Sequence, residues 1–130
     1  MQQMTTTIAL FGEAEKGKFQ TAYFCESLDA LDSFFGSPPP DTRGLYYAVQ
    51  ALLSHCNLLF FRVQEEGFSY PDYIFGLRLL QTQNTGTRVT ALCLPGIGDQ
   101  RIIQAATSYC LKYHTLMIAQ EADLYDYLAD

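Results

Sequence analysis

Short apolar runs alternate with stretches of helical periodicity along the chain. Four runs, at residues 5–11, 57–63, 89–94 and 114–119, are bounded by turn residues, as the buried strands of a parallel sheet are. Between and after them, apolar residues recur at three- and four-residue spacing, which predicts amphipathic helices. We expect these helices at residues 27–35, 41–56, 71–81, 99–113 and 121–130.

Strands that alternate with helices imply right-handed crossovers and a mainly parallel sheet. The predicted fold class is therefore α/β: a mainly parallel four- to five-stranded sheet with helices on both faces, a Rossmann-like three-layer sandwich. Residues 20–25 (QTAYFC) also have an extended pattern. With 130 residues and no internal repeat, the chain is expected to form a single domain over residues 1–130.

Local signals predict several helix ends. Ser27 and Asp99 can accept backbone N–H bonds at a helix start, and Asp41 is expected to cap the helix that follows it. Gly36 suits the left-handed position that ends a helix, and Pro71 fits a first helical turn.

The phase of each apolar stripe predicts which helical residues face the core. Turns are expected at residues 84–87 and 95–98, before and after the strand at residues 89–94. The expected core positions are Leu28, Leu31, Phe34 and Phe35; Leu45, Ala48, Val49, Leu52, Leu53 and Cys56; Ile74, Phe75, Leu77 and Leu80; Ile102, Ile103, Ala106, Tyr109, Cys110 and Tyr113; and Leu124 and Leu128.

Composition and charge narrow the class of protein. Apolar residues make up 48% of the chain, enough for a core and too much for disorder. The formal charge is −6 and the 8 basic residues are spread singly, so a nucleic-acid partner, which needs a basic face, is not expected. No apolar run approaches the roughly 18–20 residues of a membrane span. The first ten residues lack the features of a secretory signal, so a cytoplasmic location is expected.

The cysteines and histidines are interpreted as structural. The 4 cysteines include no CxxC pair and two lie on predicted core faces, as small buried hydrophobic residues do. His55 and His114 each end a predicted helix, where the helix dipole favours a histidine. Two histidines in separate elements do not have metal-ligand spacing, so neither a metal site nor a cofactor is predicted.

Loop 12–18 (GEAEKGK) has the G-x-x-x-x-G-K spacing of a phosphate-binding loop after a strand. However, Phe19 occupies the position of the Mg²⁺-binding hydroxyl, and Glu13 and Glu15 place negative charge where phosphates would sit. The residues that follow look extended, whereas the motif requires a helix whose N-terminus faces the phosphates. We interpret this segment as a charged surface loop.

Loop 95–101 is the second candidate. Gly96 and Gly98 follow a strand as in a dinucleotide-binding turn, but Arg101 stands where a third glycine should allow close helix packing. The carboxyl edge of a parallel sheet is where such folds bind ligands, so Asp99 and Arg101 remain candidates for a small-ligand site. No set of nucleophile, base and orienting group can be assembled, so no catalytic residue is predicted.

The chain contains 9 tyrosines and 9 phenylalanines. Tyrosine combines a large apolar area with a polar tip and is enriched in contact surfaces. We expect most tyrosines to be half-buried core residues and a subset to pack against neighbouring subunits. The tyrosines at polar or face-ambiguous positions are Tyr46, Tyr47, Tyr70, Tyr73, Tyr125 and Tyr127.

Several short motifs follow one another along residues 20–120. They are Phe-Gly-Ser-Pro at 35–38 after a short helix, Phe-Arg-Val at 61–63 ending a strand, Gly-Leu-Arg-Leu-Leu at 76–80, Leu-Pro at 94–95 with Gly-Asp at 98–99, and Tyr-Cys at 109–110. Their order and spacing resemble the α/β core of the tail sheath proteins of contractile phage tails and related contractile injection systems.

The resemblance implies a structural protein that acts through contacts with copies of itself or with other tail or sheath-type subunits, without cofactor or catalysis. It also implies a place in the cytoplasm or in an assembled virion or injection particle. Family members are several times longer, carry an inserted domain where residues 64–75 stand here, and link subunits by terminal arms that add strands to neighbouring sheets. The chain would then be a minimal sheath-like core or a fragment.

The alternative is a small Rossmann-like nucleotide- or metabolite-binding domain that uses loops 12–18 and 95–101. A regulatory module that binds another protein is a third class. Assembly predicts exposed aromatic patches and no deep polar pocket, whereas ligand binding predicts a cleft of converging charged groups above the strand tips.

Overall fold

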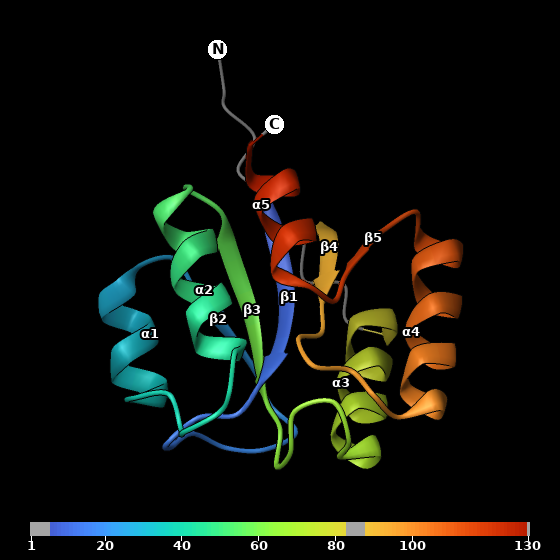
Figure 1. Ribbon diagram of the computed structural model, residues 1–130, viewed down its shortest axis with the longest axis horizontal. Coiled ribbons are helices and arrows are strands. Elements are labelled where there is room, and N and C mark those ends of the chain that lie inside the picture. Colours follow the sequence, from blue (N-terminus) through green and yellow to red (C-terminus); the bar gives the residue numbers. More distant parts are fainter. Residues whose placement is uncertain (1–5, 83–87, 130) are drawn as a thin grey trace.

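The chain begins with two strands followed by two helices, and from there strands and helices alternate (Figure 1). The computed structural model describes residues 6–82 and 88–129. The elements are β1 (Thr7–Gly12), β2 (Ala22–Cys25), α1 (Leu28–Phe35), α2 (Gly44–Leu53), β3 (Asn57–Arg62), α3 (Tyr70–Thr82), β4 (Val89–Cys93), α4 (Gln100–Tyr113), β5 (Leu116–Ile118) and α5 (Glu121–Ala129).

The strands form one five-stranded sheet in the order β2-β3-β1-β4-β5. β1 lies at the centre and pairs in parallel with β3 and β4, and β5 pairs in parallel with β4. β2 pairs antiparallel with β3 at one edge. The predicted class, a mainly parallel α/β sheet with helices on both faces, is confirmed. The extended segment at residues 20–25 supplies the antiparallel edge strand, whose direction the sequence pattern did not predict.

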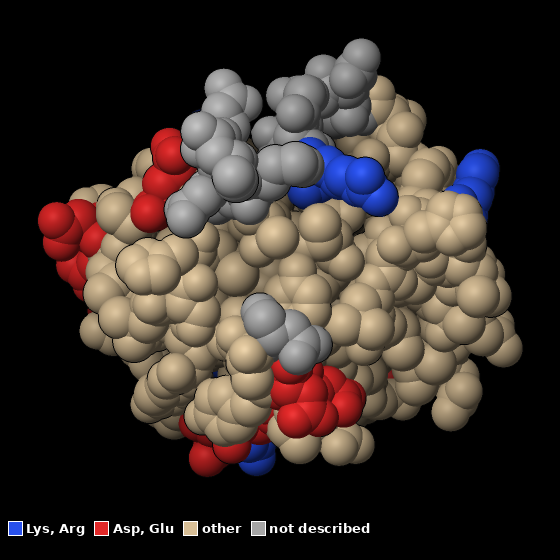
Figure 2. Space-filling view, turned by 90° about the horizontal axis from the view of Figure 1, so that it is seen from above, with Lys and Arg blue, Asp and Glu red and all other residues tan. Residues whose placement is uncertain are grey.

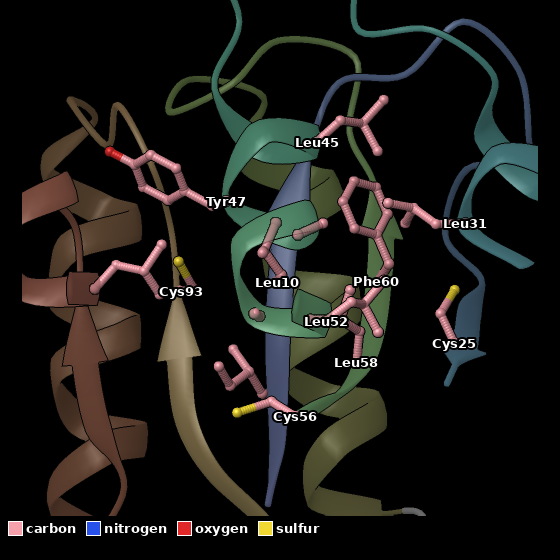
Figure 3. Packing of buried hydrophobic residues seen from close by; sticks show 14 of the residues in the cluster. Leu10, Cys25, Leu31, Leu45, Tyr47, Leu52, Cys56, Leu58, Phe60 and Cys93 are labelled. Carbon is pink, nitrogen blue, oxygen red and sulfur yellow. The ribbon is translucent and has the colours of Figure 1, made fainter. Parts of the chain in front are cut away.

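Two apolar layers lie on opposite faces of the sheet. α1, α2 and α5 pack on the face that carries Ile8, Leu10 and Phe60, and Figure 3 shows part of this layer. α3 and α4 pack on the other face, against Phe11 and Phe61. Because both faces of the central strands are covered, every residue of β1 is buried, which explains its uninterrupted apolar run.

The predicted caps of two helices are confirmed. The Ser27 hydroxyl accepts the Ala30 N–H at 3.1 Å at the start of α1, and the Asp99 carboxylate accepts the Arg101 N–H at 2.8 Å at the start of α4. Gly36 ends α1 with a φ of 70°, in the left-handed range that glycine adopts without strain.

The predicted cap at Asp41 is wrong. α2 begins at Gly44 with Arg43 in the cap position, and the cap residue's side chain accepts none of the helix's N–H groups. Asp41 is exposed and has a φ of 61°. The carboxylate at the start of α2 comes instead from Glu66, which is distant in the sequence.

Some large apolar residues expected in the core are exposed, because their helices cover the sheet with only part of the apolar stripe. α1 packs beside the edge strand β2, so Leu31 and Phe35 are buried while the flanks of the stripe face outward. The exposed side chains are Leu28 and Phe34 on α1, Leu53 on α2, Phe75 on α3 and Tyr113 on α4.

The expected turn at residues 84–87 lies outside the described residues.

β1 and α2 approach each other so closely that only glycine fits at their contact. A Cβ on Gly44 would lie 2.6 Å from the Cα of Gly12, and a Cβ on Gly12 would lie 2.7 Å from the Cα of Gly44. Both clashes involve backbone atoms, which cannot move aside without shifting the whole element. The end of β1 and the start of α2 are therefore held side by side.

The substitution Gly44→Ala should lower the free energy of unfolding by about 1–3 kcal/mol, because the added methyl group overlaps the backbone of β1. Urea denaturation followed by circular dichroism measures the change. Leu53→Ala in the same helix is the control, because Leu53 is exposed; its effect should stay within about 0.5 kcal/mol. Equal stability of Gly44→Ala and the wild type would contradict the close contact.

Candidate functional site

The carboxyl ends of β1, β3 and β4 meet at one edge of the sheet, the lower edge in Figure 1. The loops at residues 12–18, 63–69 and 94–99 leave the sheet there. In open α/β sheets this edge holds the ligand, so a small-ligand site of this chain is expected among these loops.

The centre of this edge is the carboxylate of Glu66. Its Oε2 accepts the backbone N–H groups of Glu13 and Gly44, each at 2.9 Å, and its Oε1 accepts the N–H of Arg43 at 2.9 Å. The backbone N–H of Glu66 in turn donates to the Glu13 carboxylate at 3.0 Å. One side chain thereby joins the loop after β1, the loop after β3 and the start of α2.

The Glu66 carboxylate occupies the position in which a helix N-terminus binds an anion. Free N–H groups and the positive end of the helix dipole favour negative charge there. Other folds of this kind place a ligand phosphate at the start of a helix that follows a strand. In this protein the anion belongs to the chain itself, so a phosphate at the start of α2 would have to displace Glu66.

The loop after β3 lies between the other two loops. The carbonyl of Gly67 accepts the N–H groups of Gly98 at 3.2 Å and Asp99 at 3.1 Å, and its own N–H donates to the Tyr73 hydroxyl at 2.6 Å. A Cβ on Gly67 would lie 2.0 Å from the carbonyl oxygen of Gly96. Loops 12–18 and 95–101 therefore do not face each other across an open cleft in this structure.

Loop 12–18 directs its backbone N–H groups into the protein. The N–H groups of Glu15 and Lys16 donate to the Phe35 carbonyl at 3.1 and 3.2 Å, and the N–H of Lys18 donates to the Tyr23 hydroxyl at 2.8 Å. A phosphate-binding loop needs these groups free to point at the ligand. The contacts agree with the interpretation of residues 12–18 as a charged surface loop.

Arg62 orders the same loop from the end of β3. Its Nη1 donates to the Gly17 carbonyl at 2.6 Å, and its guanidinium lies 4.3 Å from the centre of the Phe19 ring. A cation over an aromatic face is attracted by the ring's electrons. The arginine that carries part of the family resemblance therefore has a structural role in this chain.

Asp99 and Arg101, the candidate residues for a small-ligand site, lie side by side and form an ion pair with each other. Nη2 of Arg101 lies 2.9 Å from Oδ2 of Asp99, and the guanidinium lies 4.2 Å from the centre of the Tyr70 ring. The hydrogen bonds from Arg101 hold the pKa of the Asp99 carboxyl below its usual value. The pair stabilises the start of α4 and presents an exposed guanidinium rather than a ligand cleft.

Two surface hollows in the described residues lie along α2 rather than between loops 12–18 and 95–101. One, of about 460 Å³, lies between α1 and α2 and is lined mainly by apolar side chains, including Leu28, Leu45 and Val49. The other, of about 340 Å³, lies where α2 and α5 begin. It is lined by Asp41, Thr42, Arg43, Tyr46, Tyr47 and Glu121.

The four cysteines serve as packing residues of the core. Cys25, Cys56 and Cys93 are buried and Cys110 is half-buried. Burial raises the pKa of the Cys25 and Cys110 thiols to about 11 and raises that of Cys93 further. Since the thiolate is the reactive form, burial favours the unreactive, protonated form of Cys25, Cys93 and Cys110. Within residues 6–82 and 88–129, no three His, Cys, Asp or Glu side chains gather as metal ligands.

Two of the residues at this edge were not found by sequence reasoning. Glu66 is not among the candidate residues of the sequence analysis, and Tyr73, which the sequence places at a polar or face-ambiguous position, is fully buried. The sequence offers no signal for Glu66, because it predicts Asp41 as the cap of this helix and only the structure shows that α2 has no capping side chain of its own. Which of the 14 carboxylates supplies the missing acceptor depends on the packing of the loops.

Comparisons of the chain with protein-family models, with curated proteins and with solved structures found no match. Among the helices that the structure describes, none combines the length and the apolar character needed to cross a membrane.

Replacing Glu66 by alanine should lower the free energy of unfolding by about 2–3 kcal/mol, because the N–H groups of Glu13, Arg43 and Gly44 lose a charged acceptor. Chemical denaturation measures the loss. Glu65→Ala is the matched control: it removes a neighbouring carboxylate that is exposed, and a change within about 0.5 kcal/mol is expected. Equal effects of the two substitutions would contradict the assigned role of Glu66.

The emptied position in Glu66→Ala should accept a small oxyanion. Inorganic phosphate at constant ionic strength is expected to raise the melting temperature of this variant in a saturable way, because a ligand that binds only the folded state stabilises it. The wild type and Glu65→Ala should show no such saturable rise. Differential scanning fluorimetry gives the readout, and an identical phosphate response of all three proteins would contradict the prediction.

Stability should fall as the pH rises above the range in which thiols of the unfolded chain begin to ionise. The native state keeps the Cys25 thiol protonated up to about pH 11, whereas an unfolded cysteine ionises near about pH 8.5. The stability is fully present below the lower value and is lost as the pH approaches the higher one. Melting temperatures across this range should decline less steeply for Cys25→Ala than for the wild type.

Proposed function

We propose that the protein is a structural subunit, resembling the core of a contractile tail sheath, that assembles with copies of itself or with other sheath-type subunits without catalysis. The supporting observation is that the two outermost strands of the sheet, β2 and β5, each lack a partner strand on their outer side within the described residues. Within the described residues, β2 pairs only with β3, and β5 pairs only with β4. Each edge therefore presents backbone N–H and C=O groups to a partner.

Natural sheets protect their edges with short edge strands, lysine, proline or an inward-pointing charge. Both edge strands here are short, four residues in β2 and three in β5, but neither carries a charge or a proline. They read AYFC in β2 and LMI in β5. An exposed apolar edge of this kind favours association by strand addition.

Exposed apolar side chains surround both edges. Phe24 on β2, with Phe34 on α1, whose ring packs against Tyr23 of β2, forms what we call the β2 end; Leu116 on β5, with Leu111 and Tyr113 on α4, forms the β5 end. Apolar surface exposed together with unpaired backbone marks a protein–protein contact more specifically than single exposed residues do.

Three of the five sheath-like motifs fall at the ends of elements in this fold, and the other two, at 76–80 and 109–110, lie within α3 and α4. Phe35 and Gly36 end α1, Arg62 ends β3, and Asp99 caps α4. This placement is compatible with the resemblance and is one support for the proposal.

Charge also bears on the class of partner. Figure 2 shows the end of the molecule at which β1 begins and α5 ends; where grey atoms do not cover it, the basic side chains form separate spots rather than a continuous surface. A nucleic acid needs a continuous basic face. Among the described residues, the face drawn lacks such a surface, and the 8 basic residues of the chain are outnumbered by 14 acidic ones, so a protein partner is favoured over a nucleic acid.

Sedimentation velocity and light scattering over a wide range of protein concentration test the proposal. The weight-average mass should rise with concentration, because each molecule has two ends that can pair. A strict monomer at the highest concentration reached, with the folded state verified by circular dichroism, would contradict self-assembly.

The alternative, a nucleotide- or metabolite-binding domain using loops 12–18 and 95–101, keeps one supporting observation. The N–H groups around Glu66 have the arrangement that binds a phosphate. A ligand that displaces Glu66 would raise the melting temperature of the wild type. No shift with a broad panel of nucleotides would contradict this alternative and leave the assembly proposal unaffected.

A further inference from the structure

The two free edges differ in which face of the sheet they leave uncovered. Side chains alternate between faces along a strand. Cys25 belongs to the apolar layer beneath α1, α2 and α5, so Phe24 points to the opposite face, where it is exposed. Met117 belongs to the layer beneath α3 and α4, so Leu116 points to the opposite face and is exposed there.

At each edge, the outermost helix lies on the face of the sheet opposite to the face on which that edge strand's exposed side chain lies. α1 packs beside β2 on one face and α4 packs beside β5 on the other, and Figure 1 shows them as the outermost elements at the left and right. If a second copy continues the sheet, α1 of one copy lies on the face of the exposed Leu116 of the next. α4 of that next copy likewise lies on the face of the exposed Phe24.

Antiparallel pairing of like ends would not achieve this. Two β2 edges joined antiparallel would place both α1 helices on one face and leave both Phe24 side chains uncovered. Two β5 edges joined in the same way would crowd both α4 helices and leave both Leu116 side chains uncovered. The placement of the helices therefore favours contact between unlike ends over antiparallel contact between like ends. Parallel contact between like ends would set identical flanking charges side by side, Glu26 with Glu26 or Lys112 with Lys112, which is destabilising.

Strand direction and charge agree with contact between unlike ends. A sheet that continues in the same orientation sets β5 antiparallel to β2 of its neighbour, because β2 alone runs against the other strands. The exposed Glu26, just after β2, then lies near the neighbour's exposed Lys112, which precedes β5. At the other end, Lys18 lies toward the neighbour's Glu121.

A parallel arrangement of the same two strands would bring together Glu26 with Glu121 and Lys18 with Lys112. Like charges placed opposite each other are destabilising. The charges flanking the two edges are thus complementary for the antiparallel direction.

We propose that β2 of one copy pairs antiparallel with β5 of the next, so that one continuous sheet runs through neighbouring copies and α1 and α4 overlap the junction on opposite faces. In the register that aligns all of β5, Tyr23 lies opposite Ile118, Phe24 opposite Met117 and Cys25 opposite Leu116 of the next copy. This inference rests on the proposed function, since it names the surfaces through which self-assembly occurs. A contact between unlike ends produces a ring or an open helical array rather than a closed dimer.

The experiment uses the full chain with one end blocked at a time. Phe24→Lys places a charge at the β2 end, Leu116→Lys places one at the β5 end, and both side chains are exposed, so the fold should tolerate them. Each variant alone should associate about tenfold or more weakly than the wild type. Phe75→Lys on α3 is the control and should assemble normally, because Phe75 is an exposed phenylalanine outside β2, β5, α1 and α4.

An equimolar mixture of Phe24→Lys and Leu116→Lys gives the decisive result. The intact β5 end of the first variant meets the intact β2 end of the second, so a 1:1 heterodimer that does not grow further is expected in native mass spectrometry. A mixture that stays monomeric while both variants are folded would overturn the inference. Loss of assembly in only one of the two variants would also overturn it, because that pattern indicates contact between like ends.

A second pair of variants guards against misfolding and tests the direction of pairing. Glu26→Lys and Lys112→Glu change exposed charges only; each alone should weaken association about two- to fivefold at low salt, and their mixture should restore it. Failure of the mixture to recover would overturn the antiparallel arrangement. If the wild type assembles and none of these variants changes its assembly, the inference fails while the proposed function stands; a monomeric wild type contradicts both.

Discussion

The contact on which the rest of the structure depends is the one between the Glu66 carboxylate and the backbone N–H groups at the start of α2. A helix start without a capping side chain leaves donors unpaired at the positive end of its dipole. Glu66 meets that requirement from the loop after β3 and binds the loop after β1 with the same carboxylate. The glycines at positions 12 and 44 allow the backbone approach that makes this geometry possible. Three segments far apart in the sequence are thereby fixed together.

Because of this contact, the N–H groups at the carboxyl edge of the sheet bind a carboxylate of the chain itself. In an open α/β fold that edge is where a ligand is expected, and here its donors are used by atoms of the chain. Other carboxylates of the protein also bind backbone groups: like Glu66, the side chains of Glu13, Asp72 and Asp99 each accept a backbone N–H. An acidic composition is therefore compatible with a structural role and does not by itself indicate a cation or a basic partner.

The requirement that backbone groups be paired applies equally to the ends of the sheet. At β2 and β5 no element of the described chain supplies the partner strand, and exposed apolar side chains lie beside the unpaired groups. A neighbouring protein that adds a strand satisfies both the backbone groups and the apolar side chains at once. The closed carboxyl edge and the open lateral edges are the two features of the described residues on which the proposal of assembly rests.

The sequence by itself determined the elements whose stability is local. The buried runs of β1, β3 and β4 and the caps at Ser27 and Asp99 could be predicted because strand burial and helix capping depend on neighbouring residues. Only the tertiary structure decided that β2 runs antiparallel, that Leu28 and Phe34 are exposed, and that Glu66 rather than Asp41 serves α2. Each of these depends on what another segment places beside the residue, and neither periodicity nor residue type records that placement.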